Sequence, residues 1–156
     1  MIEFYVVKED VNAKEPYRAE DSIGFDLYSV ESVRIPSIQE VGSSNIAIVS
    51  TGISVSFEGP YGAFLWDRSS MGAKGVDAVG FYNEVSERLA GCIEGTYRGV
   101  WKVVLANIST KPYVINSGDK IAQVVFQKVE LPIPVSVDLH FLSSVRGKGG
   151  FGSTGR

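Results

Sequence analysis

The stretch NIAIVSTGISVSFEGPYGAFLW, residues 45–66, decides the fold class of this chain. It contains short runs of apolar and β-branched residues separated by small and turn-forming residues, a composition typical of β-strands. The tripeptide Glu58-Gly59-Pro60 divides the last two runs and predicts a turn there. The stretch therefore predicts consecutive strands joined by turns, rather than strands that alternate with helices.

The same pattern continues on both sides of this stretch. Further runs of the same kind are IEFYVV, GFDLYSV, GVWKVVLANI, YVI and KIAQVVF. A second turn signal, NSGD at residues 116–119, lies at the spacing expected for a sandwich, a barrel or a jelly roll. The chain is therefore expected to be all-β.

One segment departs from the strand pattern. In FYNEVSERLAG, Phe81, Val85 and Leu89 recur every four residues, and Gly91 could cap the end. This segment predicts one short helix.

Length and composition indicate one globular domain. The chain has 156 residues, of which 44% are hydrophobic and 21% charged, and no apolar run approaches the roughly 20 residues of a membrane span. The first ten residues, MIEFYVVKED, carry acids where a secretory signal has a basic region. We therefore expect a cytoplasmic protein, in the host cell if the source is a virus, that does not bind membranes.

The chain has one cysteine, Cys92, and one histidine, His140. This count excludes an intrachain disulfide and leaves too few ligands for a Cys/His zinc site or for zinc-dependent deamination. The formal net charge of −3 argues against nucleic acid as a partner. Any anion site must therefore be a local concentration of cations and backbone donors.

The chain ends with RGKGGFGSTGR, residues 146–156, in which five of eleven residues are glycine. Ordering such a segment costs much backbone entropy, so we expect a flexible arm that becomes ordered on a ligand. Its cations, hydroxyls, backbone N–H groups and single aromatic ring, Phe151, suit a phosphate chain joined to a flat ring. The alternative is a frayed terminus or linker without function.

Four interior stretches carry polar groups beside predicted strands. In GFDLYS, Asp26 points away from the face of its apolar neighbours, and DRSSMGAKG follows a strand with a basic, hydroxyl-rich turn around Arg68. In GCIEGTYRG, Glu94 lies beside an apolar residue, and the glycines suggest a tight hairpin. In GDKIAQVVF, Gln123 is an amide inside an apolar strand. Each stretch also has a purely structural interpretation.

The order of these stretches resembles the dUTP diphosphatase (dUTPase) family across nearly the whole chain. The resemblance runs through GFDLYS, STGISVSFEGPYGAF, RSS, GCIEGTYRGVWKVVLAN, GDKIAQVVF and RGKGGFGSTG. It implies a single-domain, jelly-roll-like β-barrel over residues 1–145, with a nucleotide-closing arm at 146–156. It also implies a Mg²⁺-dependent homotrimer that hydrolyses dUTP to dUMP and pyrophosphate by attack of water on the α-phosphate.

The resemblance assigns roles to individual residues. Glu94 would activate water, and Asp26 would hold Mg²⁺ through water as the second catalytic residue. Tyr97 would pack under the deoxyribose, and Phe151 would stack on the base. The remaining substrate-binding residues would be Arg68, Ser69, Ser70, Gly91, Gln123, Arg146, Gly150, Gly152, Ser153 and Thr154.

Three features depart from the family pattern. Glu94 stands where the family has aspartate, and its extra methylene displaces the carboxylate by about 1 Å, which can cost about 10²-fold in rate. The 26-residue spacing from Arg68 to Glu94 is longer than is usual in the family, with the extra residues between 75 and 90. Asp67 precedes RSS, where proline is common.

Two other functions remain open from the sequence. The longer segment could change the base to a modified or different pyrimidine, and Glu94 could mark a nucleotide-binding regulatory relative without catalysis. Deamination of dCTP, a reaction of a sister family, is disfavoured because Val104 occupies the position of that family's catalytic glutamate, ten residues after Glu94.

Overall fold

The computed structural model describes residues 2–137, which form twelve strands and one short helix. The elements are β1 (Phe4–Lys8), β2 (Phe25–Tyr28), β3 (Val33–Ile35), β4 (Ile46–Ser50), β5 (Ile53–Phe57), β6 (Tyr61–Trp66), α1 (Ser69–Gly72), β7 (Val76–Asn83), β8 (Arg88–Ala90), β9 (Cys92–Glu94), β10 (Lys102–Asn107), β11 (Tyr113–Ile115) and β12 (Lys120–Lys128).

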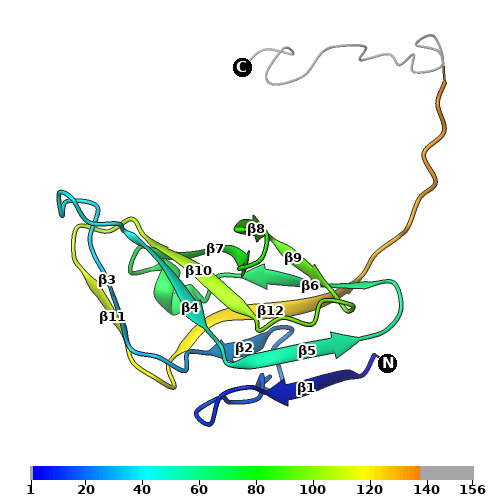
Figure 1. Cartoon of the computed structure of the whole chain (residues 1–156), viewed down its shortest axis with the longest axis horizontal. Helices are drawn as coiled ribbons and strands as arrows, with labels where there is room; N and C mark the ends of the chain where they lie inside the picture. The colour runs from blue at the N-terminus through cyan, green and yellow to red at the C-terminus, as the bar shows by residue number, and fades with distance from the viewer. Residues whose placement is uncertain (1, 138–156) are drawn as a thin grey trace.

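Two four-stranded sheets make up most of the fold (Figure 1). One has the order β4-β10-β7-β8 and the other β2-β12-β6-β9, and β1-β5 and β11-β3 form two-stranded ribbons. Every strand pair is antiparallel. The prediction of an all-β, jelly-roll-like fold is confirmed. The division into residues 1–145 and 146–156 involves residues outside the described range.

The core lies between these layers. Leu27, Leu105 and Trp101 are completely buried there. An aromatic cluster of Phe4, Phe25, Phe57 and Phe126, one residue each from β1, β2, β5 and β12, has ring centroids 4.7 to 5.8 Å apart. Burial of these rings fixes which face of each strand points inward, since a slip of one residue would expose them.

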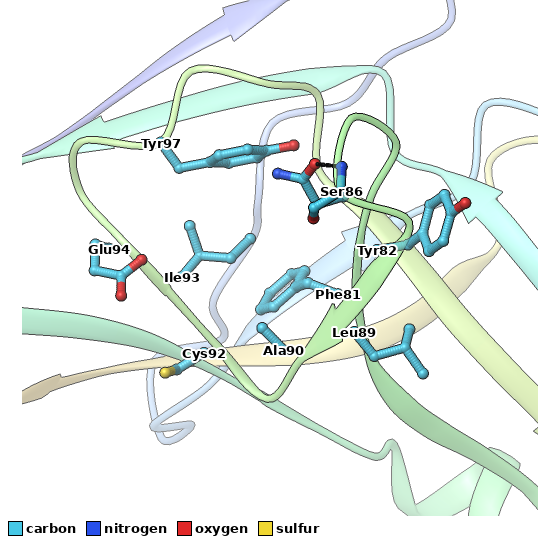
Figure 2. A pocket seen from close by; sticks show the side chains of 10 residues that line it. Phe81, Tyr82, Ser86, Leu89, Ala90, Cys92, Ile93, Glu94 and Tyr97 are labelled. Carbon is cyan, nitrogen blue, oxygen red and sulfur yellow. Dashed lines mark hydrogen bonds between the residues drawn. The ribbon is translucent and has the colours of Figure 1, made fainter.

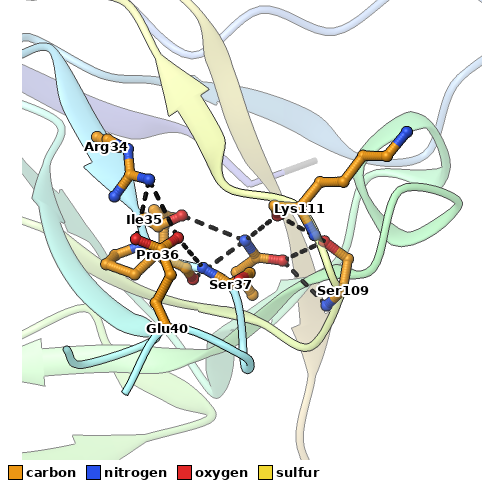
Figure 3. Close-up of polar contacts among 8 residues, drawn as sticks. Arg34, Ile35, Pro36, Ser37, Glu40, Ser109 and Lys111 are labelled. Atoms are coloured by element: carbon orange, nitrogen blue, oxygen red, sulfur yellow. Dashed lines mark hydrogen bonds and ion pairs between the residues drawn. The ribbon is translucent and has the colours of Figure 1, made fainter. Parts of the chain in front are cut away.

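A buried amide joins the end of β10 to β3 (Figure 3). Asn107 is fully buried, and its Nδ2 donates to the backbone carbonyls of Ile35, Pro36 and Lys111 at 2.8 to 3.2 Å. Its Oδ1 accepts from the hydroxyl and the backbone N–H of Ser109. Because both polar atoms of the amide are satisfied, it can be buried without the usual penalty.

The helix predicted for residues 81–91 is wrong. The segment is a hairpin, in which β7 pairs with β8 in the register Phe81↔Ala90, Tyr82↔Leu89 and Asn83↔Arg88. Asn83 Oδ1 accepts the N–H groups of Val85 and Ser86, and Glu87 adopts a left-handed φ of 52° that closes the loop. Phe81 is buried whereas Val85 is 97% exposed, so the four-residue spacing does not form one apolar face. The short helix is α1 instead.

Candidate functional site

A carboxylate held by two cations forms the first part of the site. Asp26 on β2 lies 3.2 Å from Arg68 Nε through Oδ1 and 2.7 Å from Lys120 Nζ through Oδ2. Arg68 also donates to the backbone carbonyl of Lys120 at 3.3 Å. The Asp26 side chain is only 17% exposed, so water screens these pairs less than it screens surface pairs. The hydrogen bond to Asp26 raises the pKa of Lys120, which stays charged at neutral pH.

The strand pattern explains this placement. Leu27 points into the core, and Asp26 points to the other face, where it lies opposite Gln123 of β12. A Cβ at Gly24 would lie 2.5 Å from the Gln123 side-chain oxygen, so the Gln123 side chain would have to shift to admit a larger residue there. Asp26 and Gln123, far apart in sequence, are therefore neighbours.

Arg68 directly precedes α1, and the exposed Ser69 and Ser70 form its first turn. Asp67 does not pair with this arginine: its carboxylate accepts a hydrogen bond from the Ala78 backbone N–H of β7. The acid is thereby used to join the end of β6 to β7, which explains one departure from the family pattern.

A cavity of about 510 Å³ opens beside this group and is strongly basic. Its lining includes the four cations Lys14, Arg68, Lys74 and Lys120, with Asp119 as the acidic residue. Such a concentration of positive charge suits a phosphate chain. Sequence reasoning missed Lys14 and Lys120 as site residues, although Lys120 lies three residues before Gln123 in GDKIAQVVF.

The second part of the site is a smaller pocket of about 180 Å³ beside β9 (Figure 2). Glu94 and Tyr97 both line it, together with Ile93 and side chains of the β7–β8 hairpin. Glu94 is exposed and Tyr97 half-buried. Gly91 does not line the pocket; it lies between β8 and β9, and its carbonyl accepts the Leu65 N–H.

The tight hairpin predicted around Gly95 and Gly99 is wrong. β9 pairs with β6, not with the strand that follows it, and the Tyr97 N–H bonds to the Glu94 carbonyl in a turn. A Cβ at Gly95 would collide with the Phe57 carbonyl oxygen, so this glycine serves a close approach of two backbone segments.

Within one chain the two parts lie apart. Gln123 of β12 is paired with Trp66 near one end of β6, and Glu94 of β9 is paired with Gly62 near the other end. Because Gly62 and Trp66 are four residues apart on one strand, all four positions lie on the same face of the sheet. Four residues along a strand and two strand spacings place Glu94 on the order of 15 Å from Gln123. The described residues therefore do not bring Glu94 to the cationic cluster.

Several expectations concern other parts of the chain or other ligands. Arg146, Gly150, Phe151, Gly152, Ser153 and Thr154 lie outside the described residues. Between residues 2 and 137, no group of three or more His, Cys, Asp or Glu side chains is arranged to hold a metal. No helix in that range is long and apolar enough to cross a membrane.

The fold and these two parts define a small all-β protein with a basic cavity and a separate, smaller pocket beside Glu94. Residues 12–155 match the dUTPase family model, and the chain belongs to this family. It is 37% identical over 147 residues to the deoxyuridine 5′-triphosphate nucleotidohydrolase of Paramecium bursaria Chlorella virus 1, covering 92% of each chain. The enzyme of the same name from Mycolicibacterium gilvum is 35% identical over 157 residues, covering 96% of this chain and 93% of that one.

Solved dUTPase structures share the fold. The Staphylococcus bacteriophage 80alpha dUTPase with bound dUpNHpp superposes with a TM-score of 0.78 at 23% identity, covering 99% of each chain. A mutant dUTPase of S. aureus phage phi11, which coordinates a structural Mg(II) ion, gives 0.70 at 22% identity over 87% of this chain and 97% of that one.

Proposed function

We propose that this protein is a dUTP diphosphatase, which hydrolyses dUTP to dUMP and pyrophosphate by attack of water on the α-phosphorus. The observation that carries the proposal is the pairing, in a member of this family, of a basic cavity around Arg68 with a ring-sized pocket lined by Glu94. We further propose that it acts in the cytoplasm, in the host cell if its source is a virus.

Glu94 is the proposed general base. Its carboxylate is exposed at the rim of the pocket, where it can take a proton from water, and a carboxylate in that position contributes about 10²- to 10⁴-fold. Tyr97, beside it, is the proposed platform for the deoxyribose. The longer side chain at position 94 is accommodated, in this proposal, by the different course of residues 76–90.

The phosphates are proposed to bind at the cationic cluster. Arg68, Ser69, Ser70 and Gln123 would donate to phosphate oxygens, and Lys120 would add positive charge nearby. Backbone and side chains of the arm, residues 146–156, would close over the nucleotide, with Phe151 on the base. Deleting residues 146–156 should therefore nearly abolish turnover and leave the melting temperature within a few degrees; loss of folding would contradict a separate arm.

Asp26 fits a role toward Mg²⁺ through water. Each of its two carboxylate oxygens is paired with one cation, Arg68 or Lys120. Because a carboxylate offers about four lone-pair sites, sites remain that can accept hydrogen bonds from the water molecules of a hydrated ion. Mg²⁺ prefers phosphate oxygens and water over an all-protein cage, which agrees with the single carboxylate here. When bound, the ion would neutralise charge that develops on the phosphates.

A homotrimer is the proposed active form. Glu94 must act within hydrogen-bond reach of water at the α-phosphorus, and on one chain it lies on the order of 15 Å from Gln123. A second copy would bring its own Glu94 to the cluster. The segment after β12 supports such an assembly: it leaves the sheets (Figure 1, orange), and its alternate residues Leu131, Ile133 and Val135 are 77 to 86% exposed. Such a run of exposed apolar side chains is typical of a surface that a second copy covers.

The test is pyrophosphate release from dUTP, dCTP, dTTP and UTP with Mg²⁺, in wild type and Glu94→Asp. We expect turnover of dUTP alone in wild type. If wild type instead hydrolysed another pyrimidine nucleotide, that nucleotide and not dUTP would be the substrate.

A second candidate is a nucleotide-binding regulatory protein, favoured by glutamate at position 94. Its signature is tight dUTP binding without pyrophosphate release, with turnover appearing in Glu94→Asp. That result would refute the proposed hydrolase.

A further inference from the structure

The basic cavity beside the cationic cluster extends past the residues proposed to bind the substrate's phosphates. Of those residues, Arg68, Ser70 and Lys120 line the cavity. The rest of its charged wall comes from other segments: Lys14 lies between β1 and β2, Lys74 lies between α1 and β7, and residues 118–119 form the turn between β11 and β12. We call the part lined by Lys14, Lys74 and residues 118–119 the lysine side of the cavity.

Lys14 is held in place without a counter-charge. Its Nζ donates to the Gly118 carbonyl at 3.1 Å and lies 5.1 Å from the centroid of the Tyr28 ring. Neither group is an anion, and among residues 2–137 no carboxylate forms an ion pair with Lys14. Because an ammonium group has three N–H donors, donors remain on Lys14 for a ligand.

Lys74 is placed in the same way. Its Nζ lies 5.8 Å from the centroid of the Tyr113 ring, and within the described part of the chain it has no ion pair. The face of a tyrosine ring attracts a cation by about 0.5 to 1 kcal/mol at an exposed site, but it does not cancel the positive charge. Both lysines are therefore positioned at the wall, and their charge stays available to an anion.

The turn between β11 and β12 leaves room for Lys14. Gly118 has a left-handed φ of 88°, and a Cβ there would lie 2.8 Å from Lys14 Nζ. The acidic residue of the lining, Asp119, belongs to the same turn, and its Oδ2 accepts the Asn116 N–H at 2.8 Å. The lysine side thus carries two positive charges against one carboxylate, which is engaged with its own turn.

The lining indicates which class of anion fits. The apolar side chains of the cavity, Met71, Ile115 and Ile121, are only 1 to 3% exposed. Lysines lie over the rings of Tyr28 and Tyr113. Little apolar surface is therefore left for a base or a sugar, whereas sites for organic ligands are mostly apolar. Lysine binds phosphate groups as a compact point charge, so a small inorganic polyanion is favoured.

The lysine side is continuous with the cluster. The Tyr28 ring lies near both Lys14, at 5.1 Å from its centroid, and Lys120, at 6.0 Å. Lys120 in turn pairs with Asp26. An anion released beside Arg68 therefore meets a second set of cations within the same cavity of about 510 Å³.

We propose that the lysine side is a binding site for free inorganic pyrophosphate, which Lys14 and Lys74 hold apart from the place of the substrate's phosphates. The choice of pyrophosphate among small polyanions rests on the proposed function, because hydrolysis of dUTP releases that anion at the cluster. The site gives the leaving pyrophosphate a place to move to, away from the pocket beside Glu94.

The experiment measures pyrophosphate binding to the full-length protein by isothermal titration calorimetry with Mg²⁺. Lys14→Met and Lys74→Met each keep an apolar stem and remove one charge. We expect each to raise the dissociation constant about three- to tenfold, the scale of one partly exposed charge contact. Lys128→Met is the matched control, since it removes one charge at the far end of β12, about 26 Å from Lys120, and should leave the constant unchanged.

The same variants are titrated with dUpNHpp, a dUTP analogue whose phosphates stay joined to the nucleoside. Lys14→Met and Lys74→Met should change its dissociation constant by less than about twofold, as expected for sites with separate partners. Parallel losses for pyrophosphate and dUpNHpp would overturn the inference, because the lysines would then serve the substrate's own phosphates.

The remaining outcomes separate this site from the hydrolase proposal. The inference would also be overturned by unchanged pyrophosphate binding in both lysine variants, by an equal loss in Lys128→Met, or by wild type that binds no pyrophosphate. Binding of pyrophosphate needs no hydrolysis. Lysine-dependent binding in a protein that neither binds dUpNHpp nor hydrolyses dUTP would therefore support the site and refute the hydrolase alone.

Discussion

The cationic cluster and the pocket beside Glu94 are built in different ways. Asp26, Arg68 and Lys120 come from three distant parts of the chain and are joined by ion pairs across β2, β12 and the start of α1. The pocket around Glu94 is formed mainly by residues within about 20 positions of one another, on β7, β8 and β9. The cluster is thus part of the folded framework, whereas the pocket wall is a local hairpin with an exposed tip. Changes in the cluster should affect folding and function together, whereas a change at the exposed Glu94 should affect function alone.

The largest expected effect separates the two regions most clearly. Glu94→Gln should reduce kcat for dUTP by about 10²- to 10⁴-fold, because the amide cannot take a proton from water. The melting temperature should not change, since Glu94 is exposed and makes no ion pair among the described residues. A lowered melting temperature would break the contrast by giving Glu94 a structural role.

A matched change in the cluster should act on both properties. Asp26→Asn leaves Arg68 and Lys120 without their counter-charge, and we expect the unfolding free energy to fall by about 1 kcal/mol, a value reduced for the partial exposure of both cations. We expect kcat/KM to fall on the order of 10²-fold. Urea denaturation and steady-state kinetics measure the two effects. If Asp26→Asn lost activity but kept the wild-type unfolding free energy, the cluster would contribute to function without contributing to stability, and the contrast with Glu94 would disappear.

The hairpin turn provides a smaller and opposite effect. Glu87 has a left-handed φ of 52°, so Glu87→Gly should stabilise the protein by about 0.5 to 1 kcal/mol. If residues 81–91 were the helix that the sequence pattern predicts, the same change would destabilise it by about 1 kcal/mol. The sign of the change in melting temperature therefore distinguishes the hairpin from the helix. The kcat of Glu87→Gly serves as a control for an intact site.

The smallest effect concerns alkaline pH. The hydrogen bond to Asp26 raises the pKa of Lys120 above its usual 10.5 in the folded protein. Its contribution to stability is therefore fully present below pH 10.5 and is lost as the pH rises through the folded-state pKa. The melting temperature of wild type should fall more steeply than that of Lys120→Met as the pH rises above 10.5. Parallel curves would show that the pair with Asp26 does not depend on this charge.

The sequence predicted single residues of the site better than their surroundings. The alternation around Asp26 indicated its face correctly, and strand composition predicted the sheets. The prediction of a helix for residues 81–91 was wrong because the spacing of apolar residues does not show which of them are buried. Phe81 is buried in the core, whereas Val85 is exposed to solvent. Asp67 looked like an unfavourable acid, because the Ala78 N–H that it accepts belongs to a strand eleven residues later.

The sequence by itself determined that this chain is an all-β member of the dUTPase family, because strand composition, turn residues and ordered motifs are local properties. Only the tertiary structure decided that Lys120 and Arg68 share Asp26, that Asp67 joins β6 to β7, and that residues 81–90 form a hairpin beside Glu94. These facts depend on strand register and on which buried side chains fix it, and register couples residues that local composition treats separately.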